Sequence, residues 1–145
     1  MDETNELLVC IYQDCEMAVF NLENLLNELL NKDNKIKSDI EFILKEYEKY
    51  FKETKKLMKE NKIKPQKSSM MAKMGSKIGI KNNVKKDNSD SKISDIVIQG
   101  LVMGIIDINK RIDNYKEESG KDTLMLAKRL LSFQEDSVDK LKEYL

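Results

Sequence analysis

Four acidic residues could supply the oxygen ligands of a metal site in this 145-residue chain: Glu16, Glu23, Asp107 and Glu135. Hard cations are bound by carboxylate oxygens. The alternative is that these carboxylates are surface charges beside an apolar stripe, which require no ligand. Because the sequence holds no histidine, the imidazole ligands of many transition-metal sites are missing. We interpret Glu16 and Glu23 as flanking charges and expect no metal and no other cofactor.

Covalent and acid-base chemistry have equally few candidates. Cys10 and Cys15 are five positions apart, about 140° around a helix axis, so they do not pair with each other on one helix. A cysteine or serine nucleophile usually needs a histidine base, which this chain lacks. The sequence also has no glycine-rich phosphate loop, no dinucleotide-binding motif and no cysteine cluster for zinc. It therefore predicts two reduced, mostly buried thiols and no enzyme.

A basic segment rich in methionine, residues 67–86, is the candidate partner-binding surface. Methionine is unbranched and adapts to many apolar surfaces. Lysines spaced four apart would form a row on a neighbouring face of a short amphipathic helix. The candidate partner-binding residues are Met70, Met71, Met74, Lys73, Lys77 and Lys81.

Several interpretations are open for this segment. In the first it is a packed strap: its methionines cover the open end of a helical bundle, and its lysines lie over residues 1–31, which hold seven acids and no lysine or arginine. In the others it binds a protein or peptide partner, or an anionic membrane surface. A nucleic-acid partner is not expected, because the rest of the chain is net acidic and the segment has no aromatic residue on which a base would stack.

Apolar residues at three- and four-residue steps predict the elements that position these groups. We expect helices over about 4–31, 36–60, 94–118 and 122–145, separated by a crossover, 61–93, that contains Pro65 and the short basic helix. Gly120 suits a left-handed position after the third of these helices. The first helix carries the stripe Leu8, Ile11, Cys15, Ala18, Leu22, Leu25 and Leu29, widened by Leu26 and Leu30.

The third long helix is apolar around most of its circumference. Val97, Val102, Met103 and Ile106 lie outside its main stripe. A helix of this kind is either the most buried one or carries an interface. The sequence therefore favours self-association through this helix, as a homodimer.

Polar side chains within the apolar stripes are assigned to packing. We expect the hydroxyls of Tyr12, Tyr47, Tyr50 and Tyr115 at the rim of the bundle. Gln134 occupies a core-facing position, where we expect a hydrogen bond that fixes the register of the helices.

Together these features predict one all-α domain over residues 1–145. Its expected architecture is an antiparallel four-helix bundle, in which the long crossover joins two helical hairpins. The most apolar stretch, Ile96 to Ile108, is interrupted by Gln99 and Asp107, so it is not expected to span a bilayer. The acidic amino terminus lacks the basic region of a secretory signal, and we expect a cytoplasmic protein.

Two hairpins with a long crossover, followed by the ending FQEDSVDKL at residues 133–141, resemble the ferritin-like superfamily and its small bacterial members. In that family a di-iron centre takes a glutamate from each of two helices and a Glu-x-x-His pair from each of the other two. The last helix here has Glu135 followed by Val138 in place of histidine, the second has Glu46 with Lys49 or Glu48 with Phe51, and the third has Gln99 and Asp107 without a glutamate.

The resemblance therefore implies a ferritin-like bundle that has lost its redox centre. We expect a structural or protein-interaction module. Two alternatives stay open: a carboxylate-only metal-binding or storage bundle, and a peripheral membrane protein that uses residues 67–86.

Overall fold

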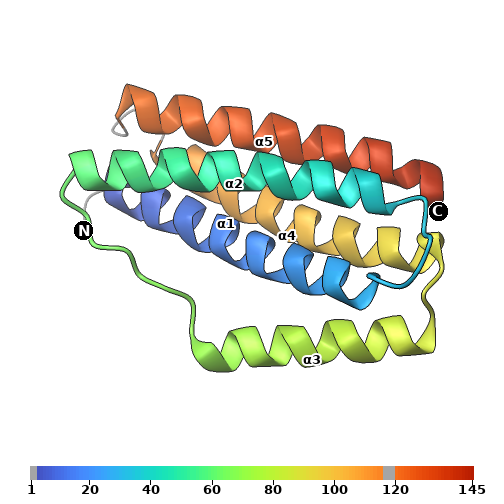
Figure 1. Cartoon of the computed structure of the whole chain (residues 1–145). Coiled ribbons are helices and arrows are strands. Elements are labelled where there is room, and N and C mark those ends of the chain that lie inside the picture. The colour runs from blue at the N-terminus through green and yellow to red at the C-terminus, as the bar shows by residue number, and fades with distance from the viewer. Residues whose placement is uncertain (1–2, 116–119) are drawn as a thin grey trace.

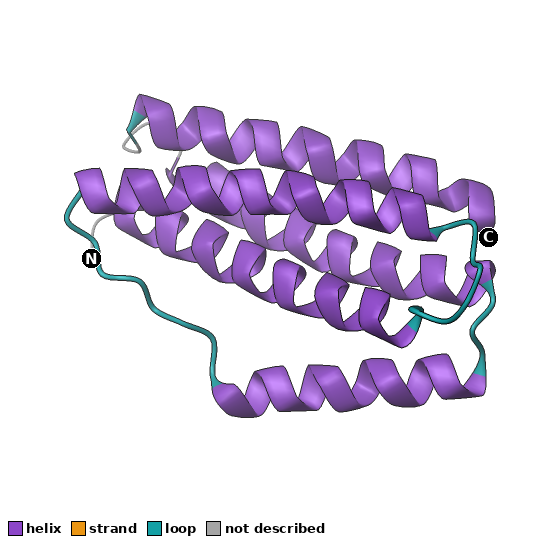
Figure 2. Ribbon diagram, viewed as in Figure 1, coloured by secondary structure: helices purple, strands orange, loops and turns teal. Residues whose placement is uncertain are grey.

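Leucine and isoleucine at helical spacing give each long segment one apolar face, and the structure folds these segments as helices. The structure, a computed structural model, describes the backbone of residues 3–115 and 120–145 and the side chains of residues 6–114 and 120–145. Within these ranges it contains helices and no strand, which confirms the all-α prediction (Figure 2). The helices are α1 (Glu3–Glu28), α2 (Lys37–Glu60), α3 (Met70–Lys86), α4 (Asp90–Tyr115), α5 (Lys121–Leu141) and the 3₁₀ helix η1 (Lys142–Tyr144).

Four of the helices, α1, α2, α4 and α5, lie side by side (Figure 1). Both α1 and α5 pack against α2 and α4. Each of these neighbours runs opposite to the helix that it contacts, as the colours in Figure 1 show. None of the helices in the described part of the chain has both the length and the apolar character that crossing a bilayer requires.

Helix α3 lies outside these four helices, against α1 (Figure 1). It is 17 residues long, so it is more extensive than the short helix predicted in the crossover. Gly75 and Gly79 lower its intrinsic helix propensity. Ser69 compensates at the N-terminus, where its side-chain oxygen accepts a hydrogen bond from the Ala72 N–H at 3.0 Å.

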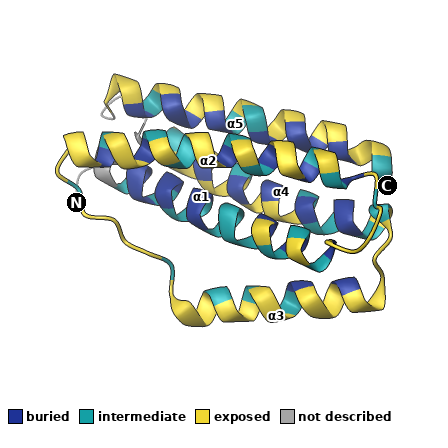
Figure 3. Ribbon diagram, viewed as in Figure 1, coloured by how far each residue is buried: buried dark blue, intermediate teal, exposed yellow. Residues whose placement is uncertain are grey.

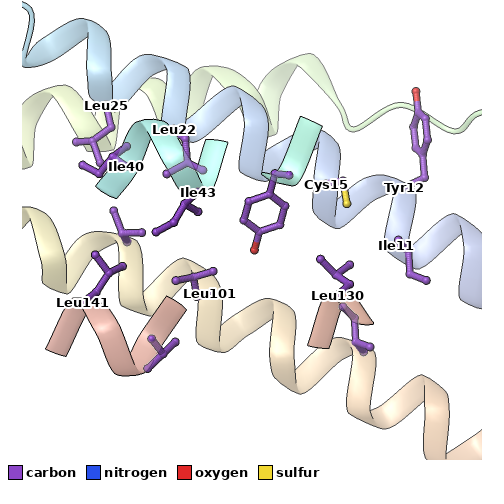
Figure 4. Close-up of a cluster of buried hydrophobic side chains, with 14 of the residues drawn as sticks. Ile11, Tyr12, Cys15, Leu22, Leu25, Ile40, Ile43, Leu101, Leu130 and Leu141 are labelled. Atoms are coloured by element: carbon purple, nitrogen blue, oxygen red, sulfur yellow. The ribbon is translucent and has the colours of Figure 1, made fainter. Parts of the chain in front are cut away.

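The interior is built mainly from leucine and isoleucine side chains of the four packed helices (Figures 3 and 4). Most of the stripe predicted for α1 is buried, namely Leu8, Ile11, Cys15, Leu22, Leu25 and Leu29. Leu30, assigned to the same stripe, is instead 67% exposed. The reason is that α1 ends at Glu28 and the chain then turns, with the Leu29 N–H bonded to the Leu26 carbonyl at 3.1 Å.

A hydrogen-bonded cap ends α2 before Pro65 is reached. The Ile63 N–H donates to the Met58 carbonyl at 2.8 Å, and the Lys62 N–H donates to the Lys59 carbonyl at 3.1 Å. Lys62 has a φ of 57°, so these bonds form a Schellman motif with lysine at the left-handed position that glycine usually occupies. The motif turns the chain away from α2 and into the segment that leads to α3.

Helix α4 begins at Asp90, four residues before the start predicted at Ser94. Ser89 supplies the cap, because its hydroxyl oxygen accepts a hydrogen bond from the Lys92 N–H at 3.2 Å. Ser94 is buried and donates its own hydroxyl to the Leu141 carbonyl at 2.5 Å.

The prediction of a left-handed Gly120 is wrong, since this residue precedes α5 with a φ of −58°. The part of the third predicted helix over residues 116–118 and the Tyr115 hydroxyl fall outside the described residues.

Candidate functional site

Glu16 on α1 holds the start of α3. Its carboxylate accepts a hydrogen bond from the Ser68 N–H at 2.6 Å and lies 3.8 Å from the Lys73 ammonium. One turn earlier on α1, the Gln13 side-chain amide donates to the Gln66 carbonyl at 3.2 Å. Glu16 is buried, which corrects its interpretation as a flanking surface charge. The reason is local: the segment before α3 crosses over this part of α1 and covers the carboxylate.

The two faces of α3 differ in their surroundings. Ile80 and Val84 are buried, and Lys73 lies with its ammonium 5.8 Å from the centre of the Phe20 ring. The opposite face is open to solvent, as the exposed colouring of α3 in Figure 3 shows. It carries Met70, Met71, Met74 and Ile78, which are 54–84% exposed.

The packed-strap interpretation is therefore correct in part. Lys73 does contact the acidic first helix, through Glu16. Lys77 and Lys81 are exposed. The three methionines do not cover an end of the packed helices, because α3 lies lengthwise along α1 and turns them outward (Figure 1).

Reversing one lysine at a time tests how firmly α3 is held. Lys73→Glu places a second carboxylate beside the buried Glu16, so we expect the free energy of unfolding to fall by about 1–2 kcal/mol at low salt. Lys77→Glu, one turn along α3 on an exposed position, should change it by less than about 0.5 kcal/mol. Urea unfolding followed by circular dichroism gives both values. Equal losses in the two variants would argue against the contact between Lys73 and Glu16.

A cavity of about 490 Å³ lies beneath α3, between this helix and α1 and α4. Residues of α2 and α5 also line it. Most of its lining is apolar, contributed by residues such as Leu22, Leu25, Ile80, Val97 and Leu101. Gly79 and Gly100 also line it, and a Cβ atom at either position would meet nothing within 4 Å. A larger side chain at either position would occupy part of the cavity.

Two buried amide oxygens at this cavity have no hydrogen-bond partner within the described residues: Asn21 Oδ1 and Gln134 Oε1. Gln134 is buried and donates its side-chain amide to the Tyr47 hydroxyl at 3.1 Å, so the prediction of a core-facing, hydrogen-bonded glutamine is confirmed. A Cβ at Gly104 would lie 2.7 Å from Gln134 Nε2. Glycine at that position of α4 therefore makes room for the Gln134 amide.

Tyr47 does not place its hydroxyl at the rim, as the sequence predicted. The side chain is buried and its hydroxyl meets Gln134 in the interior. Burial accordingly raises the pKa of Tyr47. Tyr50 agrees better with the prediction, because its exposed hydroxyl donates to the Arg129 carbonyl at 3.3 Å.

Asp14 is the titratable group that sequence reasoning missed. It lies on α1 at the edge of the cavity, and desolvation raises its pKa to about 7, with a further contribution from the charge of Asp107 on α4. Arg111 acts in the opposite direction. Next to it on α1, burial and the Asp14 charge raise the pKa of Cys10 to about 12, so this thiol stays protonated at neutral pH.

The four candidate metal ligands do not come together. Glu16 serves the α3 anchor, while Glu23, Asp107 and Glu135 occupy exposed positions on three different helices. Among the described residues, no group of three or more acidic or cysteine side chains is arranged to hold a metal ion. Both cysteines are free thiols.

Comparisons of this chain with protein-family models, curated proteins and solved structures give no significant match. The candidate site is therefore defined by the chain's own geometry. It consists of the outer face of α3, which presents methionines and lysines, and the cavity beneath the inner face of the same helix.

Proposed function

We propose that this protein is a non-enzymatic helical bundle of the ferritin-like type that binds a protein partner through α3. The arrangement that supports a ferritin-like bundle is the pair of antiparallel hairpins, α1 with α2 and α4 with α5, connected by a segment that runs the length of the molecule (Figure 1). Helix α3 occupies that connection, on the surface of the bundle.

The observation that carries the interaction is the outer face of α3. Four large apolar side chains, Met70, Met71, Met74 and Ile78, are exposed on a helix that is held at its start by Glu16 and packed through Ile80 and Val84. Contiguous exposed apolar surface with a polar rim is typical of interaction sites. Lys77 and Lys81 lie beside the methionines, so the partner surface is an apolar groove or helix flanked by acidic residues.

A photo-crosslinking amino acid placed on this face tests the proposal in the cell that makes the protein. p-Benzoylphenylalanine at position 71 should yield one defined covalent adduct of higher mass, because Met71, at 84%, is the most exposed of the four apolar side chains on this face. The matched control is position 125 on α5, where Met125 is 52% exposed but lies away from α3. We expect no adduct from that position.

The lysines supply a second control. Combining Lys77→Glu with Lys81→Glu should abolish the adduct at position 71, since it reverses the charge beside the apolar row. An adduct that survives this change, or the same adduct from positions 71 and 125, would contradict the proposal. Binding of the purified protein to anionic vesicles, lost in the same double variant, would favour the membrane alternative instead.

Self-association through α4 is the second candidate. Val102, Met103 and Ile106 are 38–67% exposed on this helix, so part of its apolar circumference faces solvent in a single chain. An interface between two copies would cover it. An adduct of twice the chain mass from the crosslinker at position 103 would support this candidate, and its absence would count against it.

A further inference from the structure

The cavity beneath α3 has two chemically different ends. Because α1 and α4 run in opposite directions (Figure 1), Leu22 and Leu25 of α1 lie beside the early part of α4, where Val97 lines the cavity. Asp14 lies towards the other end, where its charge interacts with that of Asp107. Figure 4 shows the same order along α1, with Leu22 and Leu25 on one side of Cys15 and Ile11 on the other.

Hydrogen-bond acceptors dominate the polar end. Asp14 and Asp107 contribute carboxyl oxygens, and Gln134 contributes an amide oxygen that no described residue bonds. The unpartnered Asn21 oxygen lies two helical turns from Asp14 on the same helix. No lysine or arginine is among the described residues that line the cavity. Arg111, which acts on Asp14, is outside this lining.

We propose that this cavity is a binding site for a small amphipathic amine, with its alkyl or aryl part between Leu25, Ile80 and Val97 and its ammonium group among Asp14, Asp107 and Gln134. Unpartnered buried oxygens are rare in native proteins and need a donor from a water or a ligand. An ammonium group offers three donors and no acceptor, so it matches this set of oxygens. It also brings a positive charge next to Asp14 and Asp107 from inside the cavity, where the described lining holds no lysine or arginine.

Other ligand classes fit less well. A fatty acid would bring a third carboxylate against Asp14 and Asp107, which opposes its binding. An alcohol offers one donor in place of three and brings no positive charge to Asp14 and Asp107. The volume of about 490 Å³ lies within the range of small-molecule sites. The site uses the inner face of α3 and is independent of partner binding by the outer face.

Three probes of equal chain length test the ligand class: n-octylamine, 1-octanol and sodium octanoate, each below the concentration at which it forms micelles or a separate phase. Titration followed by methyl NMR spectra of the full chain gives the dissociation constants. We expect octylamine to bind at least about tenfold more tightly than octanol and octanoate. Equal affinities for the three probes, or no binding of octylamine, would overturn the proposal.

Glycine substitutions provide matched variants for the location. Gly79→Leu puts a side chain into the cavity and should weaken octylamine binding by at least about tenfold. Gly75→Leu changes the same helix at an exposed position, where a Cβ also meets nothing within 4 Å and which does not line the cavity. It should leave binding within about twofold of the wild type. Equal effects of the two variants would place the ligand elsewhere.

Two further measurements keep the test valid if Gly79→Leu disturbs α3. In the wild-type protein, the terminal methyl group of octylamine should give NOEs to methyl groups of Leu25 and Val97. Asp14→Asn should weaken octylamine binding by at least about tenfold while changing octanol binding by less than about threefold. NOEs to Met70 or Met71 instead, or equal losses for both probes, would contradict the assignment.

Discussion

Leu29→Ala is expected to lower the free energy of unfolding by about 2–4 kcal/mol, whereas Leu30→Ala should change it by less than about 0.5 kcal/mol. The two leucines are neighbours in the chain, so the variants are closely matched in composition and position. Both lie in the turn that follows α1, where Leu29 is fully buried and Leu30 is 67% exposed. The first truncation removes packed atoms and leaves a cavity, while the second removes atoms that already contact water.

Chemical denaturation of both variants and the wild type measures this difference. The slope of the unfolding free energy against denaturant concentration should stay the same, so that the change lies in the midpoint. A larger loss for Leu30→Ala than for Leu29→Ala would mean that the turn after α1 is oriented differently, with Leu30 facing the interior.

Asp14→Asn is expected to stabilise the protein at pH 8 by about 1–3 kcal/mol. The pKa of Asp14 is raised from 3.8 to about 7 in the folded protein, mainly by desolvation and then by the charge of Asp107, with Arg111 acting against them. Between these two pH values the folded protein keeps a proton that the unfolded chain has released. The free energy of unfolding contributed by this group therefore falls as pH rises towards 7 and stays low above it.

The stabilising effect of Asp14→Asn should accordingly disappear when the comparison is made at about pH 3, where Asp14 is mostly protonated in both states. Glu23→Gln is the matched control, since Glu23 is exposed on the same helix; it should alter stability by less than about 0.5 kcal/mol at either pH. The opposite result, in which Asp14→Asn destabilises the protein at pH 8, would contradict this prediction. It would show that Arg111 stabilises the ionised carboxylate by more than burial destabilises it.

The helices and most of the interior followed from periodicity. Leu22, Leu25 and Leu29 recur at steps of three and four, and the only arrangement that buries all of them is a helix with that face inward. Leu30 shows the limit of this reasoning. Periodicity alone does not reveal that α1 ends at Glu28, because the turn that follows is set by backbone hydrogen bonds such as that from Leu29 to Leu26.

The candidate site depended on contacts between distant segments, which a single sequence does not specify. Glu16 looks like any acid beside an apolar stripe until the Ser68 N–H, 52 positions later, is placed on its carboxylate. Tyr47 resembles a rim tyrosine until Gln134 of α5 meets its hydroxyl. Asp14 has no unusual neighbour in the sequence, and its pKa is raised by burial and by the charge of Asp107 on α4, both of which depend on the fold.

The two faces of α3 differ in their surroundings: the proposed partner surface is its outer face, and the cavity lies beneath its inner face. Solvent paramagnetic relaxation of a methyl-labelled sample, with a neutral gadolinium chelate as the probe, tests this placement directly. We predict strong relaxation for the methyl groups of Met70, Met71 and Met74, and weak relaxation for those of Ile80 and Val84, similar to the interior leucines. Strong relaxation at Ile80 and Val84, or protected methionines, would contradict this placement.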